Sequence, residues 1–234
     1  MLALSPHDLL RIVDGLAAAT PAERGVALWH AVQPDLPTEA LWQAPAGCLA
    51  HAMLDLREAR LGPALELEDR CAKCEEGVEF TVRAPDLRLA RAPLENPPFD
   101  VELSGQVLRV RRVSCADLRA AERGDVAGRV ALLGRCIDGG AATLSDADCD
   151  RLDAILGERD PQADVTFSME CPACEHRWEG MFDACGVVWT ELRGEAKALL
   201  YDVDAIARTY HWSEAEILGM PARRRRQYLE LIDG

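Results

Sequence analysis

The sequence lacks a long hydrophobic run. No apolar stretch approaches the roughly 20 residues that a helix needs to cross a bilayer. The first residues, MLALSPHDLLRIV, also lack the basic segment and the small-residue cleavage site of a secretory signal. We therefore expect a soluble, cytoplasmic protein without a membrane partner.

Positive charge is scarce. The 234 residues include 26 lysines and arginines against 40 aspartates and glutamates, and the formal net charge is −14. This charge repels nucleic acid and anionic membrane surfaces, and it favours a basic partner or simple solubility. Apolar residues make up 49% of the chain, enough for one domain with additions or for two small domains.

Recognisable catalytic motifs are missing. The sequence contains no G-x-S-x-G, phosphate-binding loop, dinucleotide-binding fingerprint or H-E-x-x-H. We predict that the protein is not an enzyme and takes no small-molecule substrate. Cysteine is also sparse: nine cysteines are about 4% of the chain, well below the density of a disulfide scaffold. A reducing compartment fits this number best, with some thiols on a metal and the rest buried.

The patterns that are present indicate mainly helix. Four segments begin with a hydroxyl residue followed three positions later by an acid, which is an N-terminal capping signature. Their caps are Ser5, Thr20, Ser145 and Ser213. Residues 47–61 repeat apolar side chains at helical spacing and stop at Gly62-Pro63. An apolar stripe from Val188 to Tyr210, in steps of three and four, predicts a long helix.

Two regions in the middle of the chain have the period of strands. Residues 78–84 alternate apolar and polar side chains, and residues 99–113 predict a hairpin that turns at Ser104-Gly105. Short strands are also expected on both sides of CPAC, the second of two C-x-x-C sequences.

Two cysteine pairs have the spacing of metal-binding knuckles. CAKC supplies Cys71 and Cys74, and CPAC supplies Cys171 and Cys174. Four thiolates complete a tetrahedral zinc shell and leave no position for an activated water, so we predict one structural Zn2+ per chain in a zinc ribbon. Closing the long loop between the pairs costs about 4 kcal/mol of free energy, whereas binding of a structural zinc stabilises small zinc fingers by about 10–16 kcal/mol.

Other interpretations of these cysteines stay open. The pairs can be unrelated core thiols or a lost metal site, and His176 can replace one cysteine as ligand. A thioredoxin-like redox motif is disfavoured, because neither pair lies between a strand and a helix of a βαβ unit. The remaining cysteines share no ligand spacing and are expected to be small buried hydrophobic residues. They are Cys48, Cys115, Cys136, Cys149 and Cys185.

Three long stretches carry a resemblance to a known family. They are DPQADVTFSMECPAC, FDACGVVWTEL and YHWSEAEILGMPARRRRQYL, all within residues 160–232. Together with the N-terminal helical block and the first knuckle, they make most of the chain resemble the baseplate hub assembly family of T-even-type contractile-tailed phages, which has relatives in phage-like contractile injection systems. The resemblance implies a non-enzymatic role in building the hub and baseplate, with baseplate or hub subunits as partners.

Both knuckles depart from the family pattern. In relatives each knuckle usually has the sequence CPxCG, in which the glycine supplies a left-handed turn after the second cysteine. Here Glu75 and Glu175 stand at those positions. A non-glycine residue in that conformation costs on the order of 1 kcal/mol, which is small against zinc binding.

Together the patterns predict an α+β fold, mostly helical, with a split four-cysteine zinc ribbon and an inserted β-hairpin/helical subdomain. The expected units are an N-terminal helical block at 1–66, the ribbon at 67–85 and 164–186, the insertion at 86–163, and a long helix with a helical cap at 187–234.

A docking patch is expected beside the end of the long helix. It comprises Tyr210, Trp212, Ile217 and Leu218. Aromatic anchors among polar neighbours are typical of binding hot spots, and the alternative is that Trp212 only closes the core. The arginine run at 222–229 is interpreted as a solvated face that offsets local acid, with phosphate contact as the alternative.

The function expected is that of an assembly factor or minor baseplate component of a contractile phage tail or phage-like injection system. The rival is a zinc-ribbon nucleic-acid-binding regulatory protein, which the net charge of −14 disfavours and only the arginine run favours.

Overall fold

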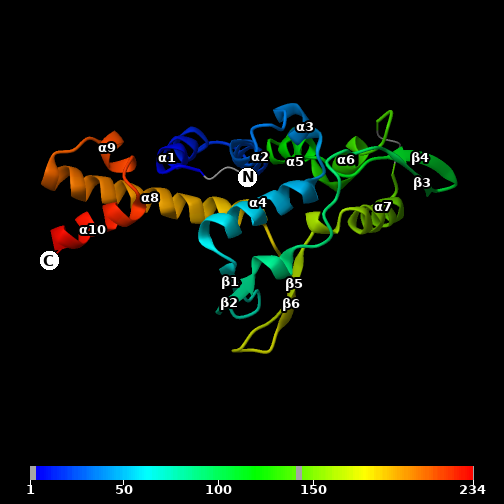
Figure 1. Ribbon diagram of the computed structural model, residues 1–234. Helices are drawn as coiled ribbons and strands as arrows, with labels where there is room; N and C mark the ends of the chain where they lie inside the picture. The colour runs from blue at the N-terminus through cyan, green and yellow to red at the C-terminus, as the bar shows by residue number, and fades with distance from the viewer. Residues whose placement is uncertain (1–3, 141–143, 234) are drawn as a thin grey trace.

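The computed structural model describes residues 4–140 and 144–233, and its fold is α+β, mostly helical, as predicted (Figure 1). A 27-residue helix, α8 (Ala184–Tyr210), runs along much of the molecule. Most of the N-terminal helices lie on one side of α8, and the knuckle-bearing hairpins project on the other (Figure 1). In the part of the chain that the structure describes, no helix is both long enough and apolar enough to cross a membrane.

The N-terminal block consists of helices whose first turns follow the predicted caps. They are α1 (Pro6–Gly15), α2 (Pro21–Val32), α3 (Thr38–Gln43) and α4 (Ala46–Leu61). The Ser5 hydroxyl accepts from the backbone N–H of Asp8, and Thr20 and Glu23 form a reciprocal capping box. These helices bury Trp29, Leu49 and Met53 against Val188 and Leu192 of α8, so the main core lies along one face of the long helix.

Four short strands and two short 3-10 helices form the region below α8. They are β1 (Ala64–Arg70), β2 (Gly77–Arg83), η1 (Ala84–Leu87), η2 (Pro161–Ala163), β5 (Thr166–Glu170) and β6 (Arg177–Met181). β1 pairs with β2 and β5 with β6, each as an antiparallel hairpin. β1 begins at Ala64, so three residues of the segment expected to be helical, 64–66, form strand instead.

The insertion is divided between two cores. Its elements are β3 (Phe99–Leu103), β4 (Gln106–Val110), α5 (Cys115–Glu122), α6 (Gly128–Arg135) and α7 (Asp146–Arg159). The predicted hairpin turns at Ser104 and Gly105, whose φ angles of 48° and 77° suit a tight two-residue turn. This hairpin packs on α6 and α7 as a second hydrophobic cluster, which includes Leu133 and Leu152.

Helix α5 does not belong to that second cluster. Cys115 at its start is buried in the main core, and the Glu122 carboxylate at its end accepts from the backbone N–H of Ala22 at 2.9 Å. The hairpin of the insertion therefore packs on α6 and α7, while α5 packs on α2 and α3.

The chain closes with a small helical cap around the end of α8. α9 (Glu214–Leu218) begins with a capping box made by Ser213 and Glu216, and α10 (Ala222–Asp233) follows Pro221. Ile217 is fully buried and Leu218 is 5% exposed. The expectation that these two residues form part of an exposed patch is wrong, because α9 packs against α1 and α8 with its apolar side facing inward.

Candidate metal centre

The two cysteine knuckles have the same backbone hydrogen bonds. In the first, the N–H of Glu75 donates to the carbonyl of Cys71 at 2.8 Å, and the N–H of Cys71 donates to the carbonyl of Glu76 at 3.0 Å. In the second, Glu175, Cys171 and His176 make the equivalent bonds at 2.9 and 2.9 Å. Each tight turn therefore directs two thiols to the same side of its hairpin.

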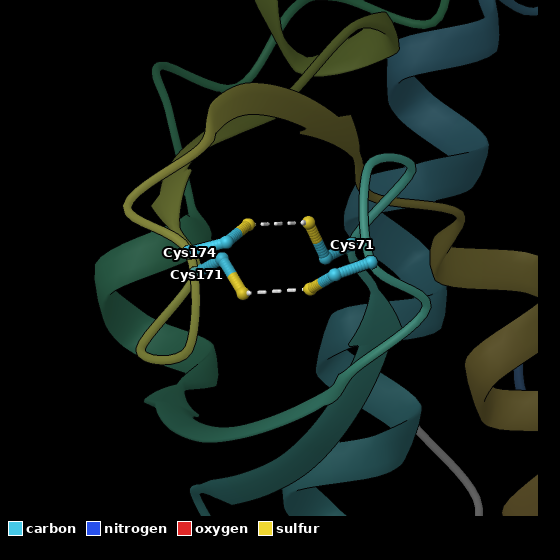
Figure 2. A group of neighbouring side chains, drawn as sticks. Cys71, Cys171 and Cys174 are labelled. Atoms are coloured by element: carbon cyan, nitrogen blue, oxygen red, sulfur yellow. Dashed lines mark hydrogen bonds between the residues drawn. The ribbon is translucent and has the colours of Figure 1, made fainter.

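The four sulfurs meet between the hairpins. Figure 2 shows the cysteines of the two turns facing one another across a small space. The Sγ atoms of Cys71 and Cys174 lie 3.7 Å apart, those of Cys74 and Cys171 lie 3.5 Å apart, and all four lie within 4.8 Å of one another. The interpretation of the pairs as unrelated core thiols is wrong, because the hairpins bring them together.

The spacing of the sulfurs fits a tetrahedral metal shell. Zinc–thiolate bonds of about 2.3 Å place tetrahedral sulfurs about 3.8 Å apart. The observed separations of 3.5 and 3.7 Å are close to that value, and they greatly exceed a disulfide bond of about 2.05 Å. The residues present therefore suit a four-thiolate metal ion, and one ion would be held by both hairpins.

The thiols differ in their tendency to ionise. Burial opposes ionisation of Cys71, but backbone hydrogen bonds from Lys73 and Cys74 outweigh it and lower the pKa of Cys71 to about 7. A backbone hydrogen bond from Glu76 favours the thiolate of Cys74, yet the neighbouring thiols of Cys174 and Cys171 raise its pKa to about 12. The cluster stabilises one thiolate by itself, and a bound cation would stabilise the others.

The hairpins pack against each other above the sulfurs. The rings of Phe80 on β2 and Phe167 on β5 meet edge to face with centroids 5.5 Å apart. The indole N–H of Trp178 on β6 donates to the carboxylate of Asp69 on β1 at 2.9 Å. A Cβ at Gly180 would lie 3.1 Å from the same carboxylate, so the absence of a side chain allows this close approach.

The centre lies at an edge of the protein. Cys71 and Cys171 are each 1% exposed, whereas Cys74 is exposed and Cys174 is half-buried. The first cysteine of each pair is therefore covered by protein, and the second cysteine is nearer to solvent. A metal ion there would join two hairpins that share only a small apolar core.

His176 is not part of this group. Among the described residues, the set of possible metal ligands that converge consists of the four cysteines. The His176 ring stacks on Trp178 with an interplanar angle of 12°, which explains its place beside the knuckle without a role as ligand.

The remaining cysteines lie away from the centre. Cys48, Cys115, Cys136 and Cys149 are buried, as expected, and Cys185 is half-buried against the main core. Burial raises the pKa of Cys48 to about 11 and that of Cys115 to about 12, so both stay neutral, unreactive thiols near pH 7.

The residues that hold the two hairpins together, Asp69 and Trp178, were not predicted from the sequence. Asp69 lies in β1, which follows a helix stop and was not predicted as a strand. The alternation in ALELE, from Ala64 to Glu68, is the signal that identifies it. The link from Asp69 to Trp178 carries no local signal, because it joins residues in different hairpins.

Comparisons of the chain with protein-family models, with curated proteins and with solved structures found no match. The resemblance to the baseplate hub assembly family therefore stays a prediction from the sequence.

Proposed function

We propose that the protein is a non-enzymatic assembly factor or minor component of the baseplate or hub of a contractile phage tail or phage-like injection system. In this proposal one structural Zn2+ is held by Cys71, Cys74, Cys171 and Cys174, and the protein acts in the cytoplasm, with incorporation into the particle as a further step. Its partners are baseplate or hub subunits.

The observation that carries the structural part of the proposal is the convergence of four sulfurs from two distant segments. Four thiolates fill a tetrahedral shell, so the metal would supply rigidity and would present no open position to a substrate. That rigidity fixes two hairpins beside α8, whose remote end carries the helical cap (Figure 1). A rigid protein with two separate surfaces can bind other subunits and hold them together.

The stretches that carry the family resemblance support the assignment to a baseplate. The first forms η2, β5 and the second knuckle, and the second leads into α8. The third forms the end of α8 with α9 and most of α10. They therefore comprise half of the candidate metal centre and most of the helical cap.

Within the predicted docking patch, Tyr210 and Trp212 keep the exposure that binding requires. Both are half-buried, and their rings stack with centroids 5.0 Å apart. Ile217 and Leu218 lie beneath the surface and support α9. We propose that the aromatic pair contacts the partner and that Ile217 and Leu218 do not.

Co-expression tests this function. The protein is produced with tagged tube, sheath and baseplate subunits of a contractile tail or injection system, and each complex is isolated by affinity and size-exclusion chromatography. We expect one baseplate or hub subunit to co-purify at a fixed ratio, and Trp212→Ala to weaken the complex while leaving the melting temperature nearly unchanged. Trp42→Ala is the control, because Trp42 is also half-buried but lies on α3. Co-purification of DNA without any of these subunits favours the nucleic-acid-binding alternative.

A further inference from the structure

Helix α10 has one stripe of buried and half-buried side chains and a neighbouring stripe that is more exposed. Arg225, Leu229 and Ile232 recur at helical spacing, and Arg225 is 6% exposed with its Nε donating to Asp202 of α8 at 3.0 Å. One position earlier, Arg224, Tyr228 and Leu231 form a parallel stripe. Its arginine is exposed, its tyrosine is half-buried, and Leu231 is 71% exposed.

This outer stripe is continuous with the aromatic pair at the end of α8. The Tyr228 ring meets Trp212 edge to face with centroids 4.9 Å apart, and it meets Tyr210 in the same manner at 5.3 Å. His211 takes the left-handed conformation, with φ of 58°, at the point where the chain leaves α8 for Trp212. The three rings therefore form one apolar surface that extends from α8 to α10.

The arginines at the start of α10 are placed unfavourably. Arg223, Arg224 and Arg226 are exposed, and within residues 4–140 and 144–233 they form no ion pair or side-chain hydrogen bond. Arg223 and Arg224 lie in the first turn of the helix, where the positive end of the helix dipole repels cations. The arginine run was interpreted as a solvated face that offsets local acid. Arg223, Arg224 and Arg226 are solvated as expected, whereas the arginine that pairs with an acid, Arg225 with Asp202, is buried.

We propose that α10 and the aromatic rings dock an acidic segment of a partner protein. Carboxylates of the segment pair with Arg223, Arg224 and Arg226, and its apolar side chains cover Trp212, Tyr228 and Leu231. Charge complementarity identifies this occupant, because an anion removes both the mutual repulsion of the arginines and their conflict with the helix dipole. The inference rests on the proposal that the protein acts by binding other proteins, and it names the chemistry of the bound segment.

A short acidic segment fits this surface better than a nucleic acid. The three rings contact one another, so their faces are not free to stack on a run of bases.

A binding assay with a defined acidic probe tests the inference. The probe is a fluorescein-labelled 20-residue peptide that combines Glu and Leu at helical spacing, and fluorescence anisotropy measures its affinity for the full chain. We expect saturable binding that weakens with added salt. R223Q/R224Q/R226Q should weaken binding by roughly tenfold or more, because three charge contacts are lost, and Trp212→Ala should weaken it further.

The matched control is R83Q/R151Q/R193Q, which removes the same charge from three exposed arginines on β2, α7 and α8. It should leave the affinity within about twofold of the wild type, because these arginines lie outside the proposed surface. Circular dichroism establishes that each variant is folded. Where the triple substitution unfolds α10, the single variants Arg223→Gln and Arg226→Gln replace it, since both residues are exposed.

Several results overturn the inference. The first two are absence of peptide binding and an equal loss of peptide affinity in the two triple variants. The third is tighter binding of a labelled 20-nucleotide DNA that depends on the same arginines. The fourth is self-association of the protein that the arginine substitutions abolish. The assay contains no baseplate subunit, so peptide binding without any co-purifying subunit refutes the baseplate role and leaves the docking surface. Co-purification that is insensitive to the arginine substitutions refutes the docking surface and leaves the baseplate role.

Discussion

Glu75 and Glu175 hold the same left-handed backbone conformation, with φ of 61° and 56°, at equivalent positions of the two knuckles. The N–H of each donates to the carbonyl of the first cysteine of its pair, at 2.8 and 2.9 Å. This conformation costs an L-residue about 1–2 kcal/mol. The chain accepts the strain because the turn directs both thiols of a knuckle toward the other hairpin.

Replacing Glu75 or Glu175 by glycine should stabilise the metal-bound protein. Glycine removes the Cβ clash, and after its greater loss of backbone entropy on folding the net gain is up to about 1 kcal/mol per site. Urea unfolding with zinc present measures the change. Glu76→Gly is the control, because Glu76 is also exposed beside the knuckle but has no left-handed φ. Equal gains for Glu75→Gly and Glu76→Gly would rule out relief of strain as the cause.

Protein purified without chelators should contain about one zinc per chain. Replacing Cys71, Cys74, Cys171 or Cys174 by serine should release the metal and lower the melting temperature, because three thiolates no longer fill the shell. Elemental analysis and thermal unfolding measure both effects. Cys48→Ser should keep its zinc, since Cys48 is buried in the main core. Metal-free protein with disulfides between these cysteines contradicts the proposal.

The hydrogen bond from Trp178 to Asp69 should stabilise the packing of the hairpins. Trp178→Phe removes the donor and keeps most of the ring, and we expect a loss of about 1–2 kcal/mol because the acceptor is charged. Asp69→Asn and the double variant complete a double-mutant cycle. Its coupling energy measures the contribution of the hydrogen bond separately from the other effects of each substitution. If the two losses simply add, the bond contributes nothing to stability.

Asp117 should make stability fall at acidic pH. This fully buried carboxylate accepts from Ser114 Oγ at 2.7 Å and from Arg135 Nε at 2.9 Å. Burial opposes its ionisation, but hydrogen bonds from Arg111 and Ser114 outweigh burial and lower the pKa of Asp117. Because the folded state holds the lower pKa, the stabilisation is present above the unfolded value of about 4 and is lost as pH falls through the folded value.

Urea unfolding at a series of pH values between neutral and about 3 tests this expectation. Asp117→Asn should lower the free energy of unfolding by about 3 kcal/mol at pH 7, because it leaves the arginines without a charge partner. The variant should also lose less stability than the wild type below about pH 4. Asp35→Asn, at an exposed position, should follow the wild-type curve. Parallel curves for Asp117→Asn and the wild type contradict the role of this carboxylate.

Features that depend on neighbouring residues were predictable from the sequence. The caps at Ser5, Thr20, Ser145 and Ser213 begin helices as expected, because a capping hydroxyl bonds to an N–H only three positions away. The hairpin turn at Ser104-Gly105 follows from the same kind of local restriction on φ. The strand β1 was not predicted, because its pairing with β2 lies across the knuckle and its leucines and glutamates also favour helix.

By itself, then, the sequence determined the helix starts, the hairpin turn and the two C-x-x-C knuckles, all of which depend on residues a few positions apart. Only the tertiary structure decided that the four sulfurs meet, that α5 packs on the N-terminal helices, and that Ile217 and Leu218 are buried while Trp212 stays half-exposed. These features depend on contacts between distant segments, whose burial is shared among many side chains, so no local pattern specifies them.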